Sequence, residues 1–299
     1  MNLAFVIYKK IMNQIKLFIE LTRLEKPIGY MLLFWPCAWG LTLAYDFTDN
    51  LKEYFFFLSL FLLGSILMRS AGCIVNDILD KDFDKKVFRT KNRPIASGKV
   101  SIKIALLYTS LLCMLALLVL LNFNQLTIIL ALCSMPFAFT YPLMKRYTYW
   151  PQLFLGITFN YGLILGWVAI KGELNTVAII FYLGAIFWTL GYDTIYGYQD
   201  IKDDEIIGLK STSIKFKGKE RKFLFICYFL LIILFFIGGY FMKFNNVFYL
   251  LMIIPLYHLF FYQLKIFKSK DPMDCLKIFK SNNLFGLIIF LNILIIKNI

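Results

Sequence analysis

Half of the acidic residues in this sequence fall in two short windows. The 299 residues include 18 Asp and Glu, and nine of these lie at 77–84 and 193–205. On a helix that turns about 100° per residue, three carboxylates of each window share one face, within about 60° in the first window and about 40° in the second. Asn76 lies close to the first face. The two faces consist of Asp77, Asp80 and Asp84, and of Asp193, Asp200 and Asp204.

Three carboxylates on one helix face repel each other and therefore favour a bound cation. Oxygen ligands without His or Cys select hard ions such as Mg²⁺ or Ca²⁺. Mg²⁺ usually takes one or two carboxylates and completes its shell with water and phosphate oxygens. The two faces, with basic residues nearby, therefore predict a Mg²⁺–diphosphate site. The alternative is a solvated charged loop, which does not explain why the helical spacing occurs twice.

Basic residues flank both windows and are candidates for binding phosphate groups. Any one of them alone would more often be a charge that sets membrane topology, but the set gains weight because it flanks the acidic faces. Arg69 differs, because it lies inside an apolar run about two turns before Asn76, where an ionisable residue is a functional hypothesis by default. It is predicted either to pair with Asp77 or Asp80 or to reach an anionic substrate. The phosphate-binding candidates are Arg89, Lys91, Arg93, Lys145, Arg146 and Lys210.

Membrane-spanning helices are the elements that must position these residues. Hydrophobic residues make up 60% of the chain, against about 45–50% in soluble domains. Apolar runs of about 17–22 residues recur, and each can cross about 30 Å of hydrocarbon as a helix. The fourth and the last runs are short, so the expected fold is an all-α integral membrane bundle of eight or nine spans. The nine runs are 28–46, 54–75, 102–121, 126–142, 152–170, 177–195, 223–241, 247–264 and 282–297.

The net charge is +14, and the distribution of the Lys and Arg along the chain predicts the membrane topology. When successive segments are assigned alternately to two sides, 26 of the 32 Lys and Arg fall on one side. This bias marks cytoplasmic loops, so we expect the N-terminus in the cytoplasm. The positive charge then reflects topology and anionic lipid headgroups, and no nucleic-acid partner is expected.

The chain is expected to form one transmembrane domain over residues 1–299. Residues 1–27 are basic and amphipathic in their central part, which predicts an interfacial segment ahead of the first span. The short apolar run near the start is not followed by a small-residue cleavage site and does not indicate a signal peptide. We therefore expect a multi-pass protein of a bacterial inner membrane rather than of a mitochondrion.

The motifs in both windows resemble those of the UbiA-type membrane prenyltransferases. NDILDKDFD at 76–84 looks like the NDxxDxxxD motif of that family, and YDTIYGYQDIKDD at 192–204 resembles its second Asp motif. Three further stretches match, RLEKPIGYMLLFWPCAWGL (23–41), RTKNRPIASGK (89–99) and YPLMKRYTYWPQLFLG (141–156). The resemblance covers residues 20–297 and is closest to the 4-hydroxybenzoate polyprenyltransferase branch, although Glu25 stands where Asp is common.

The resemblance implies a nine-helix bundle around a central cavity and an enzyme of ubiquinone biosynthesis. Its substrates would be a polyprenyl diphosphate and 4-hydroxybenzoate, joined at the ring carbon ortho to the hydroxyl, with Mg²⁺ as cofactor. Asp193 would accept the phenol proton, Arg69 or Arg23 would hold the carboxylate, and Asp77 would act with them. The implied metal ligands are Asn76, Asp77, Asp80, Asp84, Asp193, Asp200 and Asp204.

Two alternatives stay open at this stage. A cation transporter could use the carboxylates as an ion path, but transporter sites usually lie near the midplane in broken helices, whereas these windows follow spans and adjoin basic loops. Within the family, the acceptor could instead be a naphthoate, homogentisate, chlorophyllide or haem. The sequence gives neither the prenyl chain length nor the oligomeric state.

Overall fold

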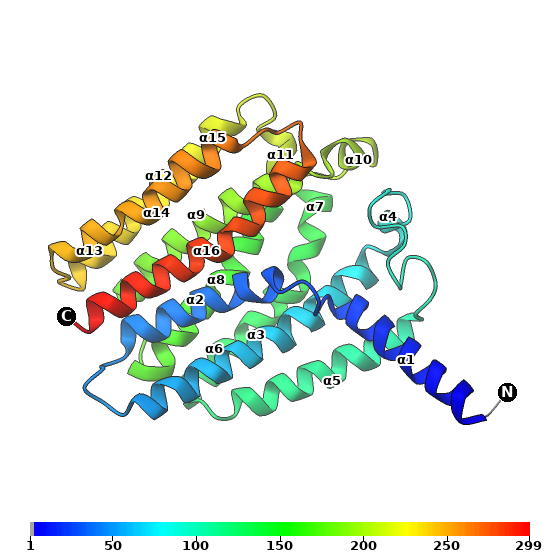
Figure 1. Cartoon of the computed structure of the whole chain (residues 1–299), viewed down its shortest axis with the longest axis horizontal. Helices are drawn as coiled ribbons and strands as arrows, with labels where there is room; N and C mark the ends of the chain where they lie inside the picture. The colour runs from blue at the N-terminus through cyan, green and yellow to red at the C-terminus, as the bar shows by residue number, and fades with distance from the viewer. Residues whose placement is uncertain (1–2) are drawn as a thin grey trace.

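The computed structural model describes residues 3–299, and this part of the chain is helical without any strand. Eight of its helical segments are long and apolar enough to cross a membrane. Figure 1 shows them running side by side as a bundle. These segments are α3 (Leu51–Leu79), α5 (Ile102–Leu120), α6 (Gln125–Thr140) continued by η1 (Tyr141–Leu143) and α7 (Met144–Tyr147), α8 (Pro151–Lys171), α9 (Thr176–Gly197), α12 (Glu220–Phe241), the composite Asn246–Ile266, and α16 (Pro272–Lys297).

The first expected span, at 28–46, is the helix α2 (Ile28–Ala44) of 17 residues. At about 1.5 Å per residue it is about 26 Å long, slightly less than the hydrocarbon thickness of a bilayer. The helix is apolar along its whole length, and every residue from Phe34 to Ala44 is buried. The eight longer segments confirm a multi-pass helical membrane protein.

Two expected spans differ in detail from the structure. The span at 247–264 is divided into α13 (Asn246–Leu251), α14 (Ile253–Tyr257), the π-helical η2 (His258–Gln263) and α15 (Leu264–Ile266). Pro255 lies in this segment, and proline lacks the N–H that a regular helix requires. The last span begins well before residue 282, because the Asp271 side chain accepts hydrogen bonds from the N–H groups of Met273 and Asp274 and so starts α16 early.

The N-terminal helix α1 (Leu3–Thr22) projects away from one end of the bundle (Figure 1). Its end is anchored, because Leu21 and Thr22 are buried. Farther from the bundle, Ile11 and Ile15 are exposed beside basic residues. This helix fits the expected interfacial segment, and its position at a membrane surface stays a prediction.

Side-chain caps fix where several spans begin. In each case a side-chain oxygen accepts a hydrogen bond from a backbone N–H of the first turn, which otherwise has no partner inside the helix. These caps hold the ends of the spans in register with the short loops between them. The capping residues are Asn50, Ser101, Asn124, Asn175 and Asn245.

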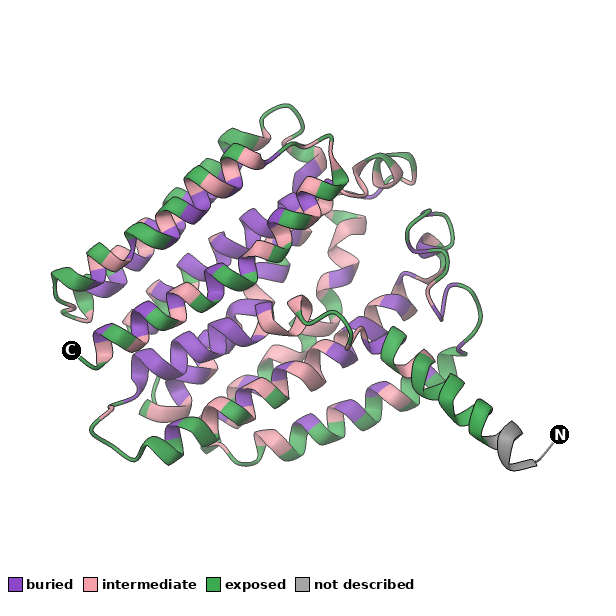
Figure 2. Cartoon of the chain, in the orientation of Figure 1, coloured by how far each residue is buried: buried purple, intermediate pink, exposed green. Residues whose placement is uncertain are grey.

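The core of the bundle is formed by α2, α8 and α9, where buried residues are concentrated (Figure 2). Glycines allow α2 and α8 to approach at backbone distance. A Cβ on Gly40 would lie 2.0 Å from the carbonyl oxygen of Leu163, and a Cβ on Gly166 would lie 2.4 Å from that of Cys37. Small residues at helix contacts allow such approach, and the resulting packing stabilises helix pairs inside a membrane.

We expect Gly40→Ala to destabilise the folded protein by about 1–3 kcal/mol, because the added methyl group overlaps backbone atoms of α8 that cannot rotate away. Thermal unfolding of the detergent-solubilised protein measures the effect. Gly64→Ala in α3 is the matched control, since a Cβ there meets only Val119, at 4.0 Å. Equal melting temperatures for the two variants would contradict the close α2–α8 contact.

The short helices gather at one end of the bundle (Figure 1). Three of them interrupt the long connections after α3 and α9, and the fourth ends the segment that begins with α6. Together they carry many of the charged residues singled out above. Their bounds are α4 (Lys81–Asp84), α7 (Met144–Tyr147), α10 (Ile201–Ile206) and α11 (Thr212–Lys215).

Candidate active site

The first aspartate segment begins in α3 and continues past its end. Asp77 lies in the last turns of α3, Asp80 caps that helix, and Asp84 lies in the short helix α4. The helix expected over 76–84 is therefore interrupted at Asp80. All three aspartates are nonetheless buried, at 2%, 2% and 6% exposure. Buried carboxylates require charged or hydrogen-bonding partners, because an unpaired buried charge is costly.

Two arginines neutralise one side of this segment. The Nη1 atom of Arg93 donates to Asp77 Oδ1 at 3.1 Å and to Asp84 Oδ2 at 2.8 Å. Arg93 thus joins the α3 and α4 carboxylates. The Nη2 atom of Arg23, from the connection between α1 and α2, donates to the same Asp77 oxygen. Asp77 is therefore the point at which three parts of the chain meet.

Asp80 faces a different pair of basic residues, from α7. Lys145 forms an ion pair with Asp80 Oδ2, and Arg146 Nη2 lies 3.8 Å from Asp80 Oδ1 while donating to the carbonyl oxygen of Leu79 at 2.6 Å. Asp80 Oδ1 is buried and has no hydrogen-bond partner. Burial raises the pKa of Asp80, although the positive charge of Lys145 opposes that shift.

The second aspartate segment is also not one continuous helix. Asp193 lies in α9, which ends at Gly197, whereas Asp200 caps α10 and Asp204 lies within it. The expected common face of these three residues is therefore broken between α9 and α10. Burial, together with the neighbouring Asp200, raises the pKa of Asp204 to about 6. A carboxyl group with such a pKa would be stabilised in its charged form by an added cation.

Arg89 links the two aspartate segments. Its Nε atom donates to Asp200 at 2.8 Å, its Nη2 atom forms an ion pair with the other carboxylate oxygen, and its Nη1 atom donates to the Tyr196 hydroxyl at 3.3 Å. Arg89 belongs to the basic loop that follows the first aspartate segment. The structure therefore brings the first basic loop against the second aspartate segment, across 111 residues of sequence.

The carboxylates meet basic side chains rather than one another. Within residues 3–299, no group of three or more His, Cys, Asp or Glu is arranged so that it could hold a metal ion by itself. Mg²⁺ bound together with phosphate needs only one or two carboxylates. The oxygen-only donor set and the unpartnered Asp80 Oδ1 fit such an ion.

Arg69 lies in α3, and its guanidinium packs over the ring of Phe159, with the Cζ atom 5.4 Å from the ring centroid. Its Nε atom is buried without a hydrogen-bond partner. Among the described residues Arg69 has no ion pair with Asp77 or Asp80, because Arg23, Arg93 and Lys145 hold those carboxylates. The guanidinium is thus placed to accept a further anionic partner.

Three residues that position Arg69 were not anticipated from the sequence. A Cβ on Gly29 would lie 2.9 Å from Arg69 Nε, so a larger residue there would displace this side chain. Phe159 packs beneath the guanidinium, and the Tyr141 ring lies edge-on to Phe159, with the ring centroids 6.4 Å apart. Gly29 and Tyr141 do belong to the matched stretches KPIG and YPLMKR, which was the one indication available.

Two further expected site residues are Lys210 and Asn76, and only Lys210 lies away from the aspartates. The Nζ atom of Lys210 donates to the carbonyl oxygen of Tyr147 at 3.1 Å and lies over the ring of Tyr149. It thus braces the connection after α7 and does not contact an aspartate. Asn76 is partly exposed in α3, one residue before Asp77. The other basic candidates that contact carboxylates are Arg23, Arg89, Arg93, Lys145 and Arg146.

Fold and site together define a helical membrane protein with buried carboxylates and basic side chains gathered at one end of the bundle. Residues 33–293 match the model of the UbiA prenyltransferase family. The chain belongs to this family, which confirms the resemblance drawn from the two aspartate motifs.

Several curated proteins are similar over almost the whole chain. The bovine (Bos taurus) protein named "4-hydroxybenzoate polyprenyltransferase, mitochondrial" is 43% identical over 292 residues, which cover 93% of this chain and 74% of the bovine protein. The Lithospermum erythrorhizon protein named "4-hydroxybenzoate geranyltransferase 2" is 42% identical, covering 95% of this chain and 91% of the plant protein.

Solved structures share the fold at lower identity. An apo UbiA homologue from Aeropyrum pernix superposes with a TM-score of 0.74 at 22% identity, covering 90% of this chain and 98% of that one. A UbiA homologue from Archaeoglobus fulgidus bound to GPP and Mg²⁺ gives a TM-score of 0.69 at 17% identity, covering 95% of this chain and all of the other. At these identities the likeness establishes the fold alone.

Proposed function

We propose that the protein transfers a polyprenyl group from polyprenyl diphosphate to the ring carbon of 4-hydroxybenzoate ortho to its hydroxyl, releasing diphosphate, in ubiquinone biosynthesis. The observation that carries the reaction class is the meeting of both aspartate segments with basic side chains through the Arg89–Asp200 contact. The choice of acceptor rests on the curated relatives at 42–43% identity, both named for 4-hydroxybenzoate.

Mg²⁺ is the cofactor that the oxygen-only donor set supports. When bound, it would neutralise the negative charge that develops on the departing diphosphate. The family pattern assigns its ligands to both segments, and the unpartnered buried Oδ1 of Asp80 supports the first of them. The proposed ligands are Asn76, Asp77, Asp80, Asp84, Asp193, Asp200 and Asp204.

The basic side chains around the carboxylates would bind the diphosphate itself. Arg89, Arg93 and Lys145 already point at the carboxylates of the two segments. A diphosphate that enters between the segments would therefore meet guanidinium and ammonium groups held in place by those contacts. Charge-assisted hydrogen bonds to phosphate are about twice as strong as neutral ones, and they would weaken the bond to the allylic carbon.

The acceptor would lie deeper in the bundle, next to Arg69. Its carboxylate would accept hydrogen bonds from the guanidinium that lies over the Phe159 ring. Arg23 is less suited to this role, since it already donates to Asp77. Asp193 would accept the phenol proton, which increases the electron density of the ring. The new bond would form between the ortho carbon and the allylic carbon as the bond from that carbon to the diphosphate oxygen breaks. The ring proton would then pass to the released diphosphate, and Asp193 would return its proton to the ring oxygen.

The membrane arrangement supports the same assignment. We propose nine spans, counting α2, around a central cavity that shields the allylic cation from water. The N-terminus and the site end would face the cytoplasm of a bacterial inner membrane, as the positive charge on those loops favours. Residues 1–27 would form the interfacial part of this single domain. A mitochondrial membrane is the alternative, since relatives are named for that organelle.

Membranes that contain the protein are expected to convert a polyprenyl diphosphate and 4-hydroxybenzoate into the prenylated acid only when Mg²⁺ is present. Removing the metal with EDTA should lower the rate by at least about 100-fold, because electrostatic stabilisation of the leaving group is lost, and added Mg²⁺ should restore it. Product is measured by chromatography, with membranes lacking the protein as the control.

The same assay also tests the acceptor. When 4-hydroxybenzoate, dihydroxynaphthoate and homogentisate compete for one prenyl diphosphate, the 4-hydroxybenzoate product should dominate. Transfer that proceeds unchanged in EDTA would refute the metal assignment. Preferred transfer to another acceptor would refute only the substrate.

A further inference from the structure

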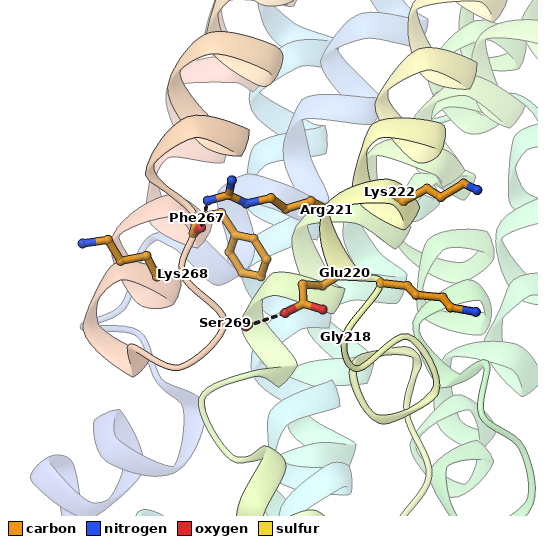
Figure 3. Close-up of a pocket in the computed structure, with 8 residues that line it drawn as sticks. Gly218, Glu220, Arg221, Lys222, Phe267, Lys268 and Ser269 are labelled. Atoms are coloured by element: carbon orange, nitrogen blue, oxygen red, sulfur yellow. Dashed lines mark hydrogen bonds between the residues drawn. The ribbon is translucent and has the colours of Figure 1, made fainter.

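A basic hollow lies apart from the two aspartate segments, where α12 begins beside the loop from α15 to α16 (Figure 3). It encloses about 500 Å³. Four of its lining side chains are basic and one is acidic, Glu220. None of the proposed site residues lines it. The basic residues are Lys219, Arg221, Lys222 and Lys268.

Hydrogen bonds fix both walls of this hollow. Arg221 Nη2 donates to the carbonyl oxygen of Phe267 at 3.2 Å, and the Ser269 hydroxyl donates to Glu220 Oε1 at 2.6 Å (Figure 3). The other carboxylate oxygen, Glu220 Oε2, is buried without a hydrogen-bond partner. Buried polar atoms are normally satisfied, so this oxygen can accept a further hydrogen bond at the edge of the hollow.

From the hollow, an exposed apolar surface continues along α12 toward its C-terminal end. Phe225 and Phe229 follow Arg221 at intervals of four residues, which places all three on one helix face. Both rings are 49% exposed, and they stack with centroids 6.1 Å apart. Phe260, from the segment before α15, packs edge-on against Phe225 at 5.3 Å. In a membrane protein this exposed aromatic surface faces acyl chains.

We propose that the hollow binds the headgroup of an anionic glycerophospholipid of the phosphatidylglycerol type. Its phosphate would be bound by Arg221, with Lys222 and Lys268 extending to either side of that arginine (Figure 3). A headgroup hydroxyl would donate to Glu220 Oε2, and an acyl chain would lie along Phe225 and Phe229. Basic pockets between transmembrane helices are the usual places for anionic headgroups. The proposal does not depend on the proposed prenyl transfer.

The excess of positive charge favours this lipid over a neutral one. Four cations and one carboxylate give the hollow a net charge of +3, which a zwitterionic headgroup would not neutralise. A free phosphate or diphosphate would satisfy the cations as well, but it would gain nothing from the apolar surface along α12. The aromatic surface and the unpartnered carboxylate oxygen therefore point to a lipid.

Thermal unfolding of the full-length protein in detergent is the test, with phosphatidylglycerol, phosphatidylcholine or inorganic phosphate added. Phosphatidylglycerol should raise the melting temperature saturably, and the other two should not. An equal rise with phosphatidylcholine, or a rise of the same size with inorganic phosphate alone, would overturn the proposal.

A charge-reversed variant, Arg221→Glu with Lys268→Glu, locates the effect. It should need at least about thirtyfold more phosphatidylglycerol for the half-maximal shift, because each of the two basic residues near a headgroup contributes about 1 kcal/mol. Lys268 also lies 3.8 Å from Asp274, so the melting temperature without lipid checks folding. Lys270→Glu, in the same exposed loop but outside the hollow, is the matched control and should bind normally. Equal loss in both variants would show that only general surface charge attracts the lipid.

Discussion

We expect Asp77→Asn to lower the rate of prenyl transfer by about 100- to 1000-fold, the loss typical of removing one preorganised electrostatic group from an active site. The substitution keeps the size of the side chain but removes the charge that holds both Arg23 and Arg93. It also removes a proposed Mg²⁺ ligand. The turnover rate at saturating concentrations of both substrates and Mg²⁺, measured in reconstituted membranes, reports the effect.

Asp82→Asn is the matched control for this prediction, because it alters the same motif outside the buried cluster. The Asp82 side chain is 85% exposed and pairs only with Lys85, at 3.2 Å. Its loss should change the rate by no more than about twofold, as for most surface substitutions. Because Asp77→Asn leaves two arginines facing a neutral group, the amount of folded protein is checked by thermal unfolding. Full activity of a folded Asp77→Asn protein would refute the role of the first aspartate segment.

The spans could be predicted from the sequence because a bilayer imposes a simple rule on the chain. A long apolar run must form a helix, since lipid offers no hydrogen-bond partner to the backbone. That rule located α3, α5, α8, α9 and α12 without knowledge of any packing. It could not locate the irregular segment around Pro255 or the early start of α16 at Asp271, since both depend on local hydrogen bonds rather than on hydropathy.

The sequence pattern predicted a set of site residues, and the continuous-helix geometry assumed for them differs from the structure. The rule of about 100° per residue assumes a continuous helix, whereas the structure breaks the helix at Asp80 and again between Gly197 and Asp200. The sequence pattern identified the carboxylates because acidic residues are rare elsewhere in the chain. The carboxylates are nevertheless brought to their partners by folding rather than by helical spacing.

Contacts between distant parts of the chain were beyond any reading of local pattern. Arg89 and Asp200 are separated by 111 residues, and nothing in either motif indicates that they pair. The same holds for the hollow beside Glu220, whose walls come from the start of α12 and from residues 267–269. Such contacts depend on how α9, α12 and α16 pack, and only the folded structure specifies that.

The second large effect is expected at Arg69. We predict that Arg69→Ala raises the KM for 4-hydroxybenzoate by about 10- to 100-fold, which is the value of a charge-assisted hydrogen bond of about 1.5–3 kcal/mol. The KM for the prenyl diphosphate should stay within about twofold, because the aspartates have basic partners of their own in Arg89, Arg93 and Lys145. Steady-state kinetics with each substrate varied in turn separates the two constants.

The chemistry of the carboxylate gives this prediction its control. Arg69→Lys keeps the positive charge but lacks the planar fork that binds a carboxylate through two hydrogen bonds, so its KM should lie between those of the wild type and Arg69→Ala. An acceptor with a neutral amide in place of the carboxylate should bind the wild type weakly and should lose little more in Arg69→Ala. If Arg69→Ala instead raised the KM for the prenyl diphosphate and left that for 4-hydroxybenzoate unchanged, the guanidinium above Phe159 would belong to the diphosphate site, and the acceptor would have to be held by another group.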